Sequence, residues 1–159
     1  MPRCLSTPTS LVVTAACAAL LMASCGSQAS QSAPRSTTQV SGIVCAQATA
    51  EYASITKTEN QLGNTSAMTA ELYASRVASI AKASAWLANH ATGVSLNARN
   101  FWRVQNLSMS EQITKAAKSG TSTDELLQYS STAQNAAFLH DGQRVISFFV
   151  AACPSFAAK

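Results

Sequence analysis

The thiols are the side chains with the most evident chemistry in this chain, which contains five cysteines. Cys4, Cys17 and Cys25 fall near the start, whereas Cys45 and Cys153 stand far apart in the remainder. A thiol can form a disulfide, ligate a metal or accept a covalent modification. The chain has no CxxC pair and no histidine close to Cys45 or Cys153, so the cysteine spacing gives no support to a metal site.

A short apolar run precedes Cys25, with the sequence LVVTAACAALLM over residues 11–22. A helix needs ~20 apolar residues to cross a bilayer, and this run is too short. Arg3 lies before the run, and the small residues Ala23 and Ser24 follow it. A basic start, a short apolar middle and a small-residue end predict a secretory signal peptide over residues 1–24.

The residues Met22-Ala23-Ser24-Cys25 resemble the lipobox of bacterial lipoproteins, in which a Leu-like residue and two small residues precede a cysteine. Met22 stands where that motif usually has leucine. In that family the cysteine receives a diacylglycerol, the leader is cut off before it, and the new amino terminus is often acylated. The resemblance implies that Cys25 is lipidated and holds the protein on the extracytoplasmic face of the cell membrane, since two or three acyl chains anchor stably. The alternative is an ordinary secretory signal in which Cys25 is incidental.

The segment after the lipobox is rich in Ser, Gln, Thr and Pro and reads GSQASQSAPRSTTQ over residues 26–39. Such a segment cannot bury enough apolar surface to offset the entropy of ordering it. We therefore expect a lipidated cysteine and a disordered, flexible tether over residues 25–40, followed by one folded domain over residues 41–159.

Cys45 and Cys153 remain once the leader and the lipid account for the other three cysteines. In an exported, oxidising setting such a pair is most simply a disulfide. We expect that bond ahead of the two alternatives, a metal pair and two free thiols. The loop-entropy model gives about 4.7 kcal/mol for closing a loop of about 110 residues.

Helical periodicity runs through the whole folded segment. Apolar residues recur on one helix face from Val44 to Leu62, and Gly63 is suited to end that helix. Asn64 or Thr65 is available to cap the next helix. The second stretch, from Tyr73 to Ala91, has the alternating steps of three and four that form the seam of a helical bundle.

The third stretch, Leu96 to Lys118, is less regular and contains the sequence Ser108-x-x-Glu111. That spacing is typical of a capping box, so this stretch is expected to form one helix or two short ones. A second capping box at Ser122-x-x-Glu125 predicts the start of a fourth helix that runs through Ala137.

The last segment, residues 143–153, is open to two interpretations. Val145–Val150 has the composition of a strand, yet Val145, Phe149 and Cys153 also form a helical stripe. No second alternating run exists in the chain to pair with a strand, so we favour a helix, with a kink at Gly142.

Together these patterns predict an all-α fold, an antiparallel bundle of four or five helices closed by one disulfide. In an up-down-up-down bundle the first and last helices lie side by side and antiparallel. Cys45 near the start of the first helix would then meet Cys153 near the end of the last. The disulfide and the bundle are inferred from separate observations, and they agree.

No pattern of catalytic residues emerges from the rest of the sequence. HExxH, GxSxG and phosphate-binding glycine loops are absent. His90 and His140 lack an evident nucleophile or orienting carboxylate, because Asp141 beside His140 would point ~100° away on a helix. We interpret the acidic residues as solvated surface charges or as charges near the start of a helix: Glu51, Glu59, Glu71, Glu111, Asp124, Glu125 and Asp141. We expect no catalytic residue, no metal and no cofactor.

One cluster could contact a partner. Arg99, Trp102 and Arg103 would share one side of a helix and could bind an anionic headgroup, a glycan or a protein. In the alternative interpretation Phe101 is a core residue, and Trp102 is half-buried beneath the arginine stems. The formal net charge of +4 is too weak and dispersed to indicate nucleic-acid binding.

These observations leave two expected functions for a lipid-anchored domain. One is a non-enzymatic domain that binds another envelope protein or a wall component. The other is a carrier that holds a lipid or haem between its helices, for which small residues such as Ala48, Ala81 and Ser84 would leave room. An enzyme is a third and weaker interpretation.

The mature domain loosely resembles the small Ala/Ser/Thr-rich helical lipoproteins of actinobacteria that carry one cysteine near each end. The matching residues are Cys45, Cys153 and the segment 145–150. This resemblance implies no particular activity.

Overall fold

Five α-helices and no strands make up the part of the chain that the structure, a computed structural model, describes: residues 40–63 and 68–156. The expectations for the signal peptide, for Cys25 and for the tether up to residue 39 lie outside these residues. The helices are α1 (Gly42–Leu62), α2 (Ala70–His90), α3 (Leu96–Lys118), α4 (Thr123–Ala133) and α5 (Ala136–Ala152).

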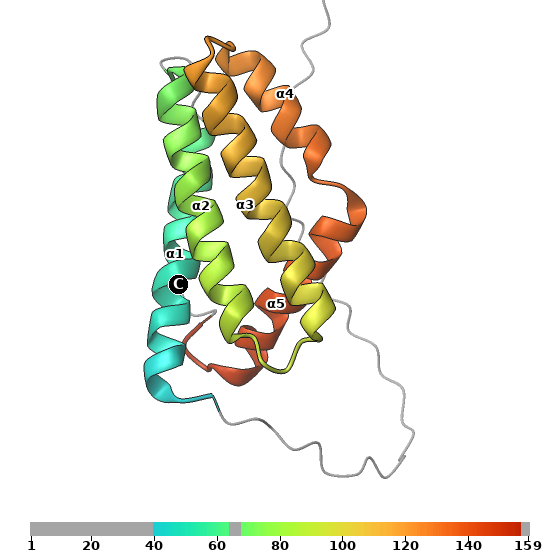
Figure 1. Cartoon of the computed structure of the whole chain (residues 1–159). Helices are drawn as coiled ribbons and strands as arrows, with labels where there is room; N and C mark the ends of the chain where they lie inside the picture. The colour runs from blue at the N-terminus through green and yellow to red at the C-terminus, as the bar shows by residue number, and fades with distance from the viewer. Residues whose placement is uncertain (1–39, 64–67, 157–159) are drawn as a thin grey trace, which may run out of the picture. The chain divides into compact units, whose positions relative to one another are not determined.

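The helices alternate in direction, which confirms the predicted antiparallel all-α bundle. In Figure 1, α1 runs upward, α2 returns, α3 runs upward again, and α4 and α5 together form the descending fourth segment. The fourth segment is broken because Asn135 caps a new helix, its side-chain oxygen accepting a hydrogen bond from the Phe138 N–H at 3.0 Å. The prediction of one helix running through Ala137 is therefore wrong.

Side-chain caps start most of the helices. Ser41 caps α1, and Ser122 with Glu125 forms the predicted capping box at the start of α4. Asn64 and Thr65, which we expected to cap the second helix, lie outside the described residues. The cap of α2 is Thr69, whose hydroxyl accepts a hydrogen bond from the Leu72 N–H at 3.2 Å, so that prediction is wrong.

The capping box expected at Ser108-x-x-Glu111 does not form, and α3 is one continuous helix. The Ser108 hydroxyl instead accepts a hydrogen bond from the Gln112 side chain at 3.1 Å. Buried Trp102, Met109 and Ile113 lie on both sides of Ser108 along α3. Their packing outweighs the local preference of serine for a helix start.

Residues 143–152 are helical, and α5 is continuous through Gly142. The missing side chain of Gly142 serves packing, because a Cβ there would lie 2.6 Å from Nε1 of the Trp102 indole. The glycine that suggested a kink is thus the point where α5 approaches α3.

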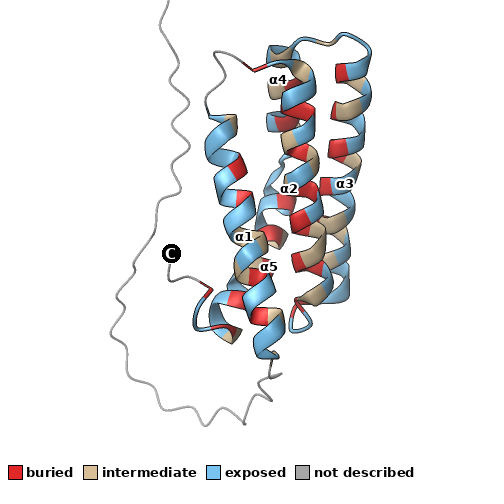
Figure 2. Ribbon diagram, turned by 90° about the vertical axis from the view of Figure 1, so that its left-hand side faces the viewer, coloured by how far each residue is buried: buried red, intermediate tan, exposed pale blue. Residues whose placement is uncertain are grey.

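The buried side chains form two separate clusters, and Figure 2 shows the buried positions along the inner faces of the helices. The first surrounds the disulfide end and contains, among others, Ala48, Leu87, Trp102, Val145, Phe149 and Cys153. The second lies toward the other end and contains Tyr73, Val77, Met109, Ile113 and Leu126 with their neighbours. The helices α2 and α3 contribute to both clusters.

The disulfide Cys45–Cys153 joins the start of α1 to the residue that follows α5, as predicted. The two Cα atoms are 5.3 Å apart and the cysteines are separated by 108 positions in the chain. Aromatic rings cover this end, with Tyr52 stacked on Phe156 at 4.9 Å and Phe149 at 5.5 Å from Phe156. The bond therefore closes almost the whole folded domain into one loop.

Removing the disulfide is expected to lower the free energy of unfolding by about 4 kcal/mol, because the unfolded chain regains the entropy of a long open loop. The change is the double variant Cys45→Ala with Cys153→Ala, and the measurement is urea unfolding of the full chain followed by circular dichroism. Reduction of the wild-type protein with dithiothreitol should give a similar loss. A loss below about 1 kcal/mol in both experiments would contradict this account.

Candidate functional site

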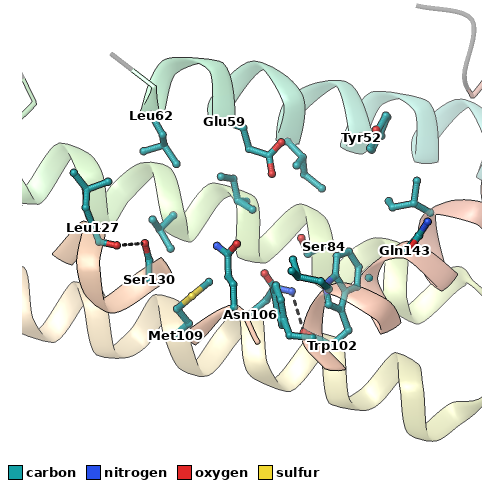
Figure 3. Close-up of a pocket in the computed structure, with 18 of the residues that line it drawn as sticks. Tyr52, Glu59, Leu62, Ser84, Trp102, Asn106, Met109, Leu127, Ser130 and Gln143 are labelled. Atoms are coloured by element: carbon teal, nitrogen blue, oxygen red, sulfur yellow. Dashed lines mark hydrogen bonds between the residues drawn. The ribbon is translucent and has the colours of Figure 1, made fainter. Parts of the chain in front are cut away.

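An open cleft of about 420 Å³ separates the two core clusters and is lined by residues from all five helices. Its volume lies in the range of about 300–1,000 Å³ that is usual for sites of small ligands. Most of its surface is apolar. The residues that Figure 3 labels are Tyr52, Glu59, Leu62, Ser84, Trp102, Asn106, Met109, Leu127, Ser130 and Gln143.

The cleft exists because α1 and α4 do not meet. Neighbouring helices pack α1 against α2, α2 against α3, and α3 against α5, whereas no backbone contact joins α1 to α4 within the described residues. The disulfide and the contacts between α1 and α5 hold the start of α1, whereas its end is held on α2, where the Arg76 guanidinium donates to the Gln61 carbonyl at 2.8 Å. The second half of α1 thus forms one wall of the cleft, and α4 and α5 form the opposite wall.

Small or polar residues stand where the packing pattern calls for large apolar side chains. Ser84 belongs to the apolar seam of α2 and is 2 % exposed, and Asn106 lies between Trp102 and Met109 on α3. The Asn106 amide donates a hydrogen bond to the Trp102 carbonyl at 2.9 Å. These short side chains leave open the space that leucine or phenylalanine would fill.

A chain of hydrogen bonds fixes the wall formed by α4. The Ser130 hydroxyl donates to the Leu127 carbonyl at 3.0 Å, so the Tyr73 hydroxyl donates to Ser130, with the two oxygens 2.6 Å apart. Burial raises the pKa of Tyr73. Tyr73 therefore enters the cleft as a neutral phenol that ties α2 to α4.

Among the described residues, Glu59 is the only charged one that lines the cleft. The residue lies on an exposed turn of α1, and Figure 3 shows its carboxylate pointing into the cleft. No ion pair joins this carboxylate to a basic side chain of the described residues, whose ion pairs all involve Asp141. Desolvation by the surrounding side chains raises the pKa of Glu59.

The three residues expected to contact a partner occupy different environments. Trp102 is 7 % exposed and lines the cleft beside Gly142. Arg99 reaches back to the end of α2, where its guanidinium donates to the carbonyls of Val94, Ala88 and Asn89 at 3.1–3.4 Å. Cations are favoured at such a helix end. Arg99 thus joins α2 to α3.

Arg103 is partly buried, and its Nε atom is buried without a hydrogen-bond partner among the described residues. Phe101 is also only partly buried. The alternative interpretation of this cluster thus had the two aromatic residues reversed, since Trp102 is the core residue and Phe101 lies nearer the surface.

The two histidines lie outside the cleft. His90 stacks on Trp86 with ring centroids 3.9 Å apart, and its Nδ1 lies 2.8 Å from the Trp86 carbonyl. The side chain of His140 is 68 % exposed, and its Nδ1 lies 3.4 Å from an Asp141 carboxylate oxygen, so these neighbours approach more closely than their helical positions suggested. Neither histidine faces a nucleophile among the contacts that the structure describes.

The described residues contain no group of three or more His, Cys, Asp or Glu side chains that could hold a metal ion. None of the helices in residues 40–63 and 68–156 is both long and apolar enough to cross a membrane. No protein-family model, no curated protein sequence and no solved structure matches this chain. The cleft therefore has to be interpreted from its own chemistry.

Sequence reasoning placed Glu59 among the solvated charges and so missed its position in the cleft. The signal that could have found it is its spacing, because Glu59 follows Ile55 by four residues and precedes Leu62 by three, on the apolar face of α1. Asn106 shows the same pattern on α3 between Trp102 and Met109. On both α1 and α3, the polar residue that interrupts the apolar stripe lines the cleft.

Glu59→Gln is expected to raise the free energy of unfolding at pH 7. The pKa of Glu59 is higher in the folded state, so wild-type stability falls as the pH rises from the unfolded value of about 4.3 through the raised folded value. Glutamine stays neutral and avoids this loss. The gain should therefore be present at pH 7 and disappear below about pH 4.

Urea unfolding of the full chain at a series of pH values measures the gain. Glu111→Gln, an exposed carboxylate on α3, is the matched control for the loss of one negative charge. Two results would show that the cleft does not desolvate this carboxylate. One is a Glu59→Gln variant that is less stable than the wild type at pH 7, and the other is a change in the free energy of unfolding that is the same at every pH.

Proposed function

We propose that this protein is an envelope lipoprotein whose helical domain binds a small, predominantly apolar ligand of the lipid class in the cleft, without catalysing a reaction on it. The cleft itself is the observation that carries this proposal. Its walls come from five helices, its volume suits a small ligand, and its lining is mostly apolar.

The distribution of small residues supports a binding function. Ser84 and Asn106 leave space in the middle of a bundle whose two ends are filled by apolar clusters. A core that served stability alone would fill this space, because unfilled volume sacrifices van der Waals contacts. An apolar ligand would restore those contacts and join the two clusters.

A lipid suits the cleft better than haem does. The propionates of haem are anionic, and in the part of the lining that the structure describes the only charged side chain is the Glu59 carboxylate. Histidine, the usual haem ligand, is absent from the lining residues that the structure describes. The Tyr73 hydroxyl, another type of haem ligand, is already hydrogen-bonded to Ser130.

Ligand binding is also favoured over the docking of an envelope protein or wall component. Two residues of the cluster expected to form a docking surface have internal roles, since Trp102 lies in the core and Arg99 binds the end of α2. A docking surface would have to be built from other residues.

The proposed location rests on the cysteines. The lipobox-like sequence ending at Cys25 implies a lipid anchor, and the disulfide Cys45–Cys153 is of the kind that persists in oxidising compartments outside the cytosol. The anchor would hold the cleft close to a membrane, where apolar ligands concentrate.

Cys25→Ala is expected to abolish incorporation of labelled palmitate and to release the protein from the membrane fraction, because the chain would lose its anchor. The measurement is metabolic labelling and membrane fractionation of cells that express the full chain. Cys17→Ala is the control, since it changes a leader cysteine outside the lipobox. If Cys25→Ala stayed labelled and membrane-bound, the anchor would have to lie elsewhere.

A matched pair of tryptophan variants tests the cleft. Ile80 lines it, so Ile80→Trp narrows it, whereas Ile43→Trp makes the same change at a residue that is 85 % exposed and outside the cleft. We expect Ile80→Trp to reduce labelling of the cleft severalfold and Ile43→Trp to leave it unchanged.

The readout is cross-linking of the full chain by dodecanol that carries a terminal diazirine, with the labelled peptides identified by mass spectrometry. Digitonin is the suitable detergent, because its bulky steroid body competes poorly for a site that accepts a single alkyl chain. Label spread evenly over the surface, or equal labelling of both tryptophan variants, would rule out the cleft as the binding site.

A further inference from the structure

We propose that the cleft selects amphiphiles whose apolar body ends in an amine, and that the Glu59 carboxylate binds the ammonium group. This inference rests on the proposed function of the cleft as a ligand site. It goes beyond that function by naming the headgroup of the ligand and the residue that recognises it.

The position of Glu59 in the cleft sets where the headgroup would lie. Glu59 is in the second half of α1, between Ile55 and Leu62, where α1 has no backbone contact with α4 in the described residues and the cleft is open. From there the lining continues past Ile80 and Ser84 to Trp102 without another charged residue. An amphiphile would therefore place its charge at Glu59 and its apolar body toward the disulfide end.

The charge of the cleft determines which headgroup it favours. A carboxylate without a basic partner repels an anionic headgroup, and the apolar walls strengthen this effect by lowering the local dielectric. An ammonium group supplies a counter-charge and hydrogen-bond donors at the same place. Desolvation by the surrounding side chains raises the pKa of Glu59, which agrees with the absence of an ion pair to this carboxylate in the described residues.

The other polar groups that line the cleft in the described residues are neutral, and several already have partners. The Tyr73 hydroxyl is hydrogen-bonded to the Ser130 hydroxyl, which donates to the Leu127 carbonyl. The Asn106 amide donates to the Trp102 carbonyl. They offer no positive charge that would attract a carboxylate or phosphate headgroup. Glu59 is therefore the group that distinguishes one ligand charge from another.

Three probes with the same alkyl chain and a terminal diazirine test this selection at pH 7: dodecylamine, dodecanol and dodecanoate. Each is cross-linked to the full chain in digitonin, and labelling is counted on peptides that line the cleft. In the wild type we expect the amine to label these peptides about tenfold more than the carboxylate, with the alcohol between them.

Three variants separate charge recognition from partitioning of the probes into detergent. We expect Glu59→Gln to lower amine labelling to the level of the alcohol while leaving alcohol labelling unchanged. Glu59→Asp keeps the charge and should retain most of the preference for the amine. Glu111→Gln removes an exposed carboxylate outside the cleft and should change nothing.

The possible failures are distinguishable. If all probes label the cleft but Glu59→Gln leaves amine labelling unchanged, or if the carboxylate is preferred, amine selection is wrong and the cleft remains a ligand site. If no probe labels the cleft peptides, both this inference and the proposed function are wrong.

Discussion

The structure depends on how α1 is held. The disulfide Cys45–Cys153 fixes the start of α1 beside the end of α5, and packing on α2 supports the rest of the helix. At its other end α1 has no backbone contact with α4 in the described residues, and the Arg76 guanidinium of α2 donates to the Gln61 carbonyl. A bundle helix that packs along most of its length on one neighbour leaves a space along its other side, and in this protein that space is the cleft.

The cleft also explains why the core consists of two clusters. Ser84 and Asn106 interrupt the apolar seams of α2 and α3, and Gly142 allows the Trp102 ring to lie against α5. Each interruption is small, yet together they divide the interior between the disulfide end and the end that holds Tyr73 and Leu126. The helices α2 and α3 run through both core clusters and hold them in a fixed relative position.

The sequence predicted the helices and the disulfide well, because helical periodicity and a leftover cysteine pair are local or countable signals. It failed where packing overrides a local signal. The Ser108 capping box did not form within the long buried face of α3, whereas Asn135 started a new helix inside a predicted one. Glu59 was missed because a single-helix pattern does not show which helices fail to meet, and the cleft arises from that gap.

The one-sided attachment of α1 has a mechanical consequence. With a covalent link at Cys45 and no backbone contact with α4 in the described residues, a swing of α1 away from α4 would widen the cleft at the cost of its packing on α2 and of the hydrogen bond from Arg76 to the Gln61 carbonyl. Such a swing would displace the Gln61 end of α1 most and the Cys45 end least. In the proposed ligand site, the cleft would thus keep a constant width near Trp102, where the alkyl chain lies. Beside Glu59 its width would vary, so that headgroups of different bulk could fit.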